Sequence, residues 1–132
     1  MKYLLTIYGD ESGFETMTPE QGKELMDAYG AFGAEIEAAG VYVGGEGLQP
    51  SATATTVRVR DGERLLTDGP FAETKEQLGG YYLLDCEDLD EAIGWAAKIP
   101  GVFQGAVEVR PVMDYEAMGA SGDHPASREA AH

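Results

Sequence analysis

The chain has 132 residues, of which 43% are hydrophobic and 25% charged, a size and composition typical of one globular domain. Its 24 acidic and nine basic residues give a net charge of −15. The basic residues are too few and too scattered to form the patch with which proteins meet nucleic-acid phosphates, so we expect no nucleic-acid partner. No apolar run approaches the roughly 20 residues of a membrane span. The start, MKYLLTIYGDE, lacks the long apolar region of a signal peptide, so we expect a cytoplasmic protein without a membrane partner.

Histidine and cysteine are scarce. His124 and His132 both lie near the C-terminus, which excludes His-based triads, Cys–His pairs and the usual zinc sites from the folded body. The single cysteine, Cys86, follows an apolar strand pattern and is expected to be a small buried side chain. No carboxylate spacing resembles a Ca²⁺ loop. We therefore expect neither a metal ion nor a cofactor.

The first predicted elements are a strand and a long helix. KYLLTIYG alternates, which predicts a strand with Tyr3, Leu5 and Ile7 on an apolar face and Leu4, Thr6 and Tyr8 on a mixed face. Thr18 has the pattern of an N-cap, with Pro19 at the first helical position and Gln21 completing a capping box. The expected buried stripe of this helix consists of Leu25, Met26, Tyr29, Phe32, Gly33 and Ile36, and Gly40 ends the helix.

The middle of the chain predicts short strands. VYVGGEGL is a glycine-weakened strand whose glycines lack the spacing of a phosphate loop, so a bulged strand edge is expected. The run TATTVRVRDGERLLT predicts a hairpin that turns at Asp61-Gly62. GGYYLLDC is the next alternating strand.

The last part predicts a helix, a strand and a tail. Asp88 and Glu91 form a capping box for a helix whose expected buried residues are Leu89, Ala92, Ile93 and Ala96. Pro100-Gly101 stops this helix, and GAVEVRPV is the final strand. Residues 114–132 are poor in large apolar side chains. We therefore expect one α+β domain over residues 1–113 and a flexible tail over 114–132, with a turn of helix near its start.

This order of elements predicts an α+β fold, an antiparallel sheet with two helices on one face. The second face of the sheet is mixed rather than polar: Leu4, Thr6, Tyr8, Arg58, Tyr81 or Tyr82, Glu108 and Arg110. Leucine and tyrosine on that face indicate partial cover, and a second copy of the same sheet is the simplest cover. The sequence thus predicts a homodimer with a polar-lined cavity between two sheets.

TDGPFAETKEQLGGYYLLDC, followed by DLDEAIGWAAKIPG and GAVEVRPV, closely resembles the YCII-related proteins of the DGPF-motif branch. The opening MKYLLTIYGDE and the segment AAGVYVGGEGL also resemble that family, so the likeness covers residues 1–112. The resemblance implies a ferredoxin-like fold that pairs as a dimeric α+β barrel. It also implies a link with extracytoplasmic-function sigma factors. Many members carry a His-Asp pair, and one branch resembles a dehydrochlorinase of a hydroxylated aromatic, but this chain has no body histidine to match that pair.

The segment TDGPFAETKE, residues 67–76, is the candidate site. A structural interpretation assigns Asp68, Gly69 and Pro70 to a rigid turn, with Asp68 bonding nearby amides and Phe71 filling the core or a dimer interface. A local cap formed by Thr74 with Gln77 is a further structural interpretation.

The functional interpretation makes Asp68 and Glu73 candidate catalytic carboxylates that act as general acid or base. The expected ligand-binding residues are Tyr8, Arg58, Phe71, Lys75, Glu108 and Arg110, in which the cations hold an anionic or enolic group. Two functions follow. One is a dimer that binds a small molecule as a sensor linked to a sigma factor. The other is a cofactor-free lyase, isomerase or oxygenase of a small aromatic or carboxylated compound.

Overall fold

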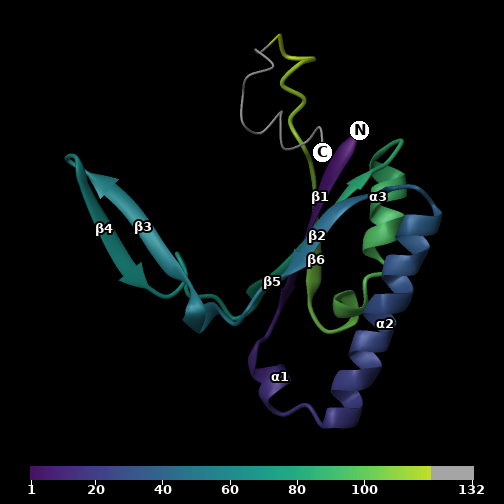
Figure 1. Cartoon of the computed structure of the whole chain (residues 1–132), viewed down its shortest axis with the longest axis horizontal. Helices are drawn as coiled ribbons and strands as arrows, with labels where there is room; N and C mark the ends of the chain where they lie inside the picture. The colour runs from purple at the N-terminus through teal and green to yellow at the C-terminus, as the bar shows by residue number, and fades with distance from the viewer. Residues whose placement is uncertain (120–132) are drawn as a thin grey trace.

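The computed structural model describes residues 1–119 and shows an α+β domain with a ferredoxin-like core (Figure 1). The strands are β1 (Lys2–Gly9), β2 (Tyr42–Gly47), β3 (Thr55–Arg60), β4 (Glu63–Asp68), β5 (Gln77–Asp85) and β6 (Ala106–Pro111). The helices are α1 (Ser12–Glu15), α2 (Pro19–Ala38) and α3 (Leu89–Ala96), with 3-10 turns η1 (Ser51–Thr53) and η2 (Pro100–Phe103). The tail is described only as far as residue 119, and residues 115–119 form a turn in which the Asp114 side chain accepts from the amide of Ala117. The remainder of the predicted tail lies outside the described residues.

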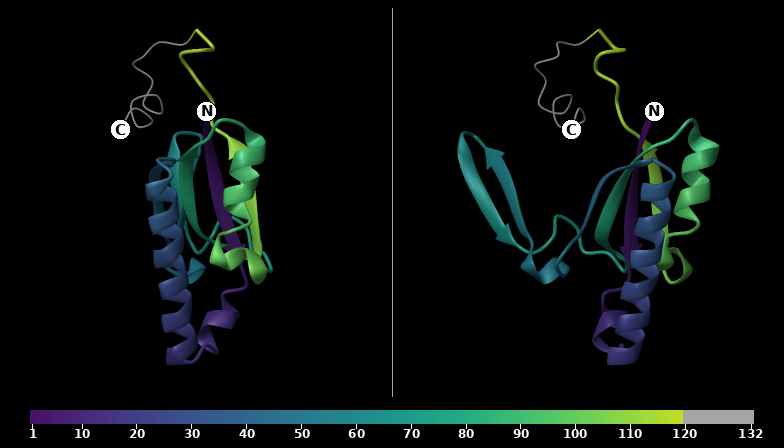
Figure 2. Two further views of the ribbon diagram at one scale, coloured as in Figure 1. Left: turned by 90° about the vertical axis from the view of Figure 1, so that its right-hand side faces the viewer. Right: turned by 45° about the vertical axis from the view of Figure 1, so that its right-hand side comes forward.

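Four strands form an antiparallel sheet in the order β2-β5-β1-β6. The first strand, β1, lies in the interior of this sheet, and the last strand, β6, lies at its edge. Helices α2 and α3 cover one face of this sheet (Figure 2). The opposite face, called here the open face, carries no helix in either view. The pairings Leu4 with Leu83 and Thr6 with Tyr81 place these side chains on the open face. Of the two tyrosines considered for this face, Tyr81 is therefore the one that lies there.

The core lies between the sheet and its helices. Leu5, Ile36, Leu84 and Ile99 are fully buried. The ring of Phe32 meets Tyr82 edge-on at 5.1 Å between centroids, and meets Trp95 at 6.4 Å. Each large buried side chain of this kind stabilises the fold by roughly 1.5–3 kcal/mol. Cys86 is 2% exposed, which confirms the expected buried thiol.

The boundaries of α2 were predictable from local signals. The Thr18 hydroxyl accepts from the Gln21 amide at 3.1 Å, and the Gln21 side chain accepts from the Thr18 amide at 3.0 Å, which completes the capping box. Gly40 has φ +74°, as expected of a residue that ends a helix. The glycines of β2 form a bulged edge, since the register with β5 shifts between Tyr42 and Gly44. These predictions are confirmed.

Three predicted core positions are wrong. Met26 is 70% exposed, because the N-terminal half of α2 extends past the sheet toward α1 (Figure 1). Leu89 and Ile93 are 46% and 49% exposed. The residues of α3 that face the sheet are Ala92 and Ala96, and both are buried. Both pairs repeat every four residues, so spacing alone did not distinguish them, and the smaller pair gives the closer approach to the sheet.

The hairpin does not lie where the sequence pattern predicted. β3 and β4 do not join the four-stranded sheet but form a separate two-stranded sheet. This hairpin, residues 55–68, is called here the arm, and it projects away from the body on the side opposite the helices (Figures 1 and 2). Asp61 and Gly62 turn it with φ of +51° and +79°. Arg58 therefore does not lie on the open face of the sheet, where the sequence pattern had placed it.

Candidate functional site

The segment that joins the arm to β5, residues 68–76, is called here the DGPF segment. Gly69 adopts φ +104°, a conformation that side-chain-bearing residues rarely take. Its amide donates to the Ala54 carbonyl at 2.7 Å, and its carbonyl accepts from the Thr56 hydroxyl at 2.9 Å. The turn is thus held by the Gly69 backbone, in a left-handed rather than an extended conformation, and Asp68 closes β4 opposite Thr55.

Phe71 lies beside the arm and not in the core. Its side chain is 74% exposed, and the guanidinium of Arg58 lies 4.9 Å from the ring centroid. A cation–π contact of this kind at an exposed position contributes about 0.5–1 kcal/mol. The expectation that Phe71 fills the core is therefore wrong, while its alternative place in a dimer interface stays a prediction. The structure brings Arg58 and Phe71 together, but on the arm.

The end of the DGPF segment is anchored to the body by Gln77. The side-chain oxygen Oε1 of Gln77 accepts from the Glu11 backbone amide at 2.9 Å, and the side-chain nitrogen Nε2 donates to the Thr74 backbone carbonyl at 2.5 Å. The Thr74 hydroxyl donates to the Glu76 carbonyl. No helix begins at Thr74, because Gln77 opens β5, so the local-cap interpretation is wrong although the two residues do interact.

One hollow of about 520 Å³ lies where the DGPF segment meets the sheet, and is called here the sheet-side hollow. Its lining residues are Tyr8, Thr74, Lys75, Glu76, Ala106, Val107 and Glu108. Three predicted ligand-binding residues, Tyr8, Lys75 and Glu108, thus meet from three different segments. Arg110 lies at its border, donating to Glu108 at 2.7 Å, with the Glu108 side chain 47% exposed. This hollow offers an aromatic ring, one cation and two carboxylates within one space.

A second hollow of about 530 Å³, called here the arm-side hollow, also borders Thr74. Its lining residues are Ser51, Ala52, Asp68, Gly69, Pro70, Ala72, Glu73, Thr74 and Gln77. It contains both candidate catalytic carboxylates, Asp68 and Glu73. Asp68 and Glu73 therefore line a different hollow from Tyr8, Lys75 and Glu108, and the two hollows share Thr74. Arg58 and Phe71 line neither hollow.

Several site residues were missed by sequence reasoning. Glu11 accepts from the Ser51 amide at 2.6 Å and the Ser51 hydroxyl at 2.7 Å, which ties the base of the arm to the loop after β1. Asp10 accepts from the Ser12 hydroxyl at 2.7 Å. The Ser12 side-chain and backbone hydrogen bonds hold the pKa of Asp10 below its usual range, and the positive charge of Lys75 acts in the same direction. The contacts of Glu11 with Ser51 and with Gln77 join residues 40 and 66 positions apart, a separation for which no local pattern exists.

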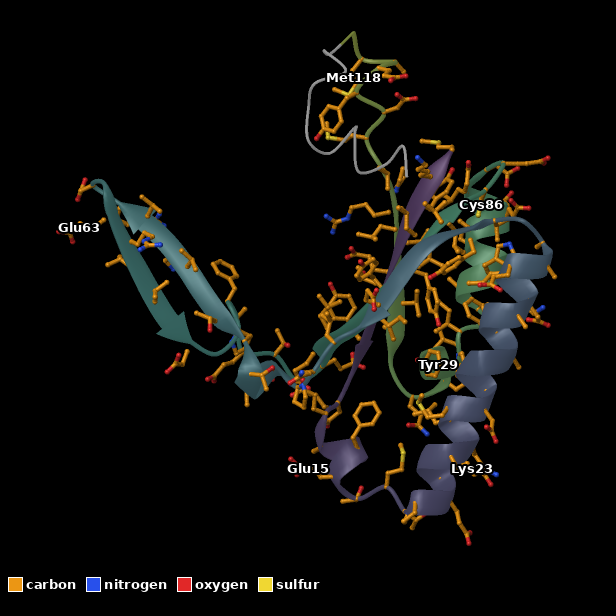
Figure 3. All side chains as sticks on the ribbon, in the orientation of Figure 1. Glu15, Lys23, Tyr29, Glu63, Cys86 and Met118 are labelled. Atoms are coloured by element: carbon orange, nitrogen blue, oxygen red, sulfur yellow. The ribbon has the colours of Figure 1, made fainter. Side chains whose placement is uncertain are left out.

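Within the part of the chain that the structure describes, no group of three or more His, Cys, Asp or Glu side chains is placed to hold a metal ion. Among the same residues, none of the helices has both the length and the apolar character needed to cross a membrane. Figure 3 shows the side chains on the ribbon, with Cys86 and Tyr29 on the helix-covered side of the body and Glu63 at the tip of the arm.

Comparison with known proteins places the chain in a family. The model of the YCII-related domain matches residues 1–116, so the chain belongs to the YCII-related family. An uncharacterized protein of Rhizobium meliloti (strain 1021) is 38% identical over 118 residues, covering 88% of this chain and 95% of that protein.

Among solved structures, the chain is similar to 5-chloro-2-hydroxyhydroquinone dehydrochlorinase from Burkholderia phenoliruptrix AC1100, solved in complex with 2,5-dihydroxybenzoquinone. The sequence identity is 16% and the TM-score 0.46, covering 89% of this chain and 98% of that one.

Proposed function

We propose that this YCII-related protein is a homodimer that binds a small hydroxylated aromatic or carboxylated molecule in the sheet-side hollow. The observation that carries the proposal is the meeting of Tyr8, Lys75 and Glu108 in one space of about 520 Å³. That volume lies in the range of small-molecule sites. The proposed cytoplasmic location follows from the sequence features alone.

The chemistry of the lining residues defines the ligand class. Tyr8 offers a ring for stacking, and the side chains of Ala106 and Val107 offer apolar contact. Lys75 is the one cation of the lining and suits a single carboxylate or phenolate oxygen, while Glu76 and Glu108 accept from hydroxyl groups. Since the chain carries a net charge of −15, a polyanion would be repelled. A hydroxylated ligand with at most one negative charge fits this lining.

The open face of the sheet supports the homodimer. Leu4, Leu83 and Tyr81 are only half-buried there, and none of the helices in the described part of the chain lies over them. Burying apolar surface of this kind contributes about 25 cal/mol per Å². A second copy that covers this face would also bound the sheet-side hollow, because Tyr8 and Glu108 lie on the same face.

Affinity measurements test the site. A panel of hydroxylated and carboxylated aromatics is screened by thermal shift, and each hit is titrated calorimetrically with Lys75→Ala and with the matched control Lys23→Ala on α2. Loss of a hydrogen bond to a charged group costs about 1.5–3 kcal/mol, so we expect Lys75→Ala to weaken binding by roughly 10- to 150-fold and Lys23→Ala to leave it unchanged. Equal effects of the two variants would overturn the site.

A second function, a cofactor-free lyase, isomerase or oxygenase, is supported by the arm-side hollow, where Asp68 and Glu73 share one lining. In this function the two carboxyl groups act as general acid and general base in moving a proton within a bound ligand. Exchange of a ligand C–H for deuterium, followed by NMR, tests this function. Loss of exchange in Asp68→Asn and Glu73→Gln would favour the enzyme, and an unchanged signal in both variants would exclude these residues.

The proposed link to an extracytoplasmic-function sigma factor comes from the family resemblance. In this proposal the occupied dimer acts as a sensor. Co-purification of the full chain with a sigma factor encoded beside its gene, in the presence and absence of a ligand from the screen, tests the link. A ligand-independent failure to co-purify would remove the regulatory part of the proposal and leave the binding site.

A further inference from the structure

The arm presents an apolar face that no other segment of residues 1–119 covers. Its register pairs Val57 with Leu66 and Val59 with Arg64, so these four side chains share one face. Val57 and Val59 are each 57% exposed, and Leu66 is 67% exposed. The two arm strands pair with each other and make no extensive contact with the helices or the larger sheet. An isolated two-stranded hairpin is at best marginally stable in water, so this face requires a partner surface.

The charge of the arm distinguishes it from the body. Three of the nine basic residues of the chain, Arg58, Arg60 and Arg64, lie on the arm. Its acidic residues, Asp61, Glu63 and Asp68, balance them, so the net charge of −15 lies outside the arm. A neutral hairpin with arginines on both faces is not repelled by such a body, and its arginines are attracted to surface carboxylates.

The same chain offers a matching surface. The open face carries Leu4, Leu83 and Tyr81, with Glu46 beside Tyr81 on β2 and Glu108 beside Thr6 on β6. This is an apolar centre with Glu46 at one border and Glu108, paired with Arg110 of the same chain, at the other. An apolar hairpin face that ends in Arg64 is complementary to the apolar centre and to the Glu46 carboxylate. When two chains meet about a two-fold axis, each contact forms twice, so the arm of each chain can cover the open face of the other.

We propose that the arm of each chain clasps a second copy, docking Val57, Val59 and Leu66 against the open face of that copy beside its sheet-side hollow. This inference rests on the homodimer of the proposed function and adds the element that makes the contact. Arg64 then lies near the carboxylates of Glu76 and Glu108, which line the hollow. Each hollow is therefore incomplete until the arm of the other chain lies across it.

Two leucines provide a matched test, since Leu66 lies on the docking face and Leu65 points to the opposite face of the same strand. The full chain, Leu66→Glu and Leu65→Glu are compared by sedimentation velocity and by amide hydrogen exchange. A charge placed in a buried contact costs more than about 1.4 kcal/mol, so we expect Leu66→Glu to raise the dimer dissociation constant at least tenfold. Its arm amides should lose protection, while Leu65→Glu behaves as the unmodified chain.

Val59→Glu repeats the test on the same face, and protection of the β1 and β5 amides reports an intact body in every variant. A dimer whose arm amides exchange as fast in the unmodified chain as in Leu66→Glu would overturn the clasp and leave the homodimer of the proposed function. A monomeric unmodified chain, with or without a protected arm, would overturn both. Equal weakening by Leu65→Glu and Leu66→Glu would overturn the assignment of the docking face.

Discussion

The body and the arm of this protein are built from similar alternating strands but differ in what supports them. In β1, alternate residues such as Tyr3 and Leu5 are buried against the helices. In β3 and β4 every residue is exposed except Thr56, which is half-buried. The body forms its core within one chain, whereas the arm has strand geometry without a core. Alternation therefore indicates a strand and its two faces, but not which surface will cover them.

The largest expected effect separates these two regions directly. Leu84 is fully buried in the body, so Leu84→Ala should lower the free energy of unfolding by about 2–5 kcal/mol. Leu65 on the arm is 44% exposed, and Leu65→Ala should change the free energy of unfolding by less than about 0.5 kcal/mol. Urea unfolding of both variants measures the difference. Equal losses would show that the arm is part of the cooperative core.

Gly69 lies at the junction between the body and the arm, and its substitution tests how rigidly this junction is held. Its φ of +104° is strained for any side chain, so Gly69→Ala should cost about 1–3 kcal/mol locally. We expect the amide of residue 69, which bonds to Ala54, to exchange roughly 5- to 150-fold faster.

The matched control for Gly69 is Gly30→Ala on the exposed side of α2, where no atom lies within 4 Å of the added carbon. This change should stabilise the body by about 0.5–1 kcal/mol, because it reduces the freedom of the unfolded chain. If both alanine variants slow exchange at their own sites, the strain assigned to Gly69 is wrong.

Within the body, the capping box predicts a smaller effect. Thr18→Ala removes the side-chain acceptor of the Gln21 amide and should cost about 1 kcal/mol in unfolding free energy. Gln21→Ala removes the reciprocal bond and should cost less, since the hydroxyl contact remains. No loss in the Thr18 variant, measured by urea unfolding, would mean that the helix end is held by other contacts.

The smallest effect at neutral pH concerns Cys86. Burial, and after it the carboxylates of Glu91 and Asp85, raise the pKa of the Cys86 thiol to about 11 from 9.0. At pH 8 the folded chain should therefore be alkylated about 100-fold more slowly than the unfolded chain. The unfolded thiol ionises near pH 9 and the folded one near 11, so this group lowers stability only as pH rises above 9. Fast alkylation of the folded chain would contradict the burial.

The sequence was most informative where the cause is local. Capping residues around Thr18, the Asp61-Gly62 turn and the alternation of β1 each act within a few positions, and all are present as expected. For the candidate site, the sequence identified several of the residues that line the hollows, but not how those residues are grouped in space. Tyr8, Lys75 and Glu108 do meet, but Asp68 and Glu73 line a neighbouring hollow, and Arg58 lies on the arm. Strand pairing across the sheet decides these positions, and the contact of Glu11 with Ser51 has no local signature.

The most direct test of the account is native mass spectrometry of the full chain, purified under non-denaturing conditions and sprayed over a range of concentrations. We expect twice the 14.1 kDa mass of one chain, together with a bound small molecule that Lys75→Ala no longer retains. A single chain at every concentration would contradict the account, because the open face and the arm would then have no second copy to cover them.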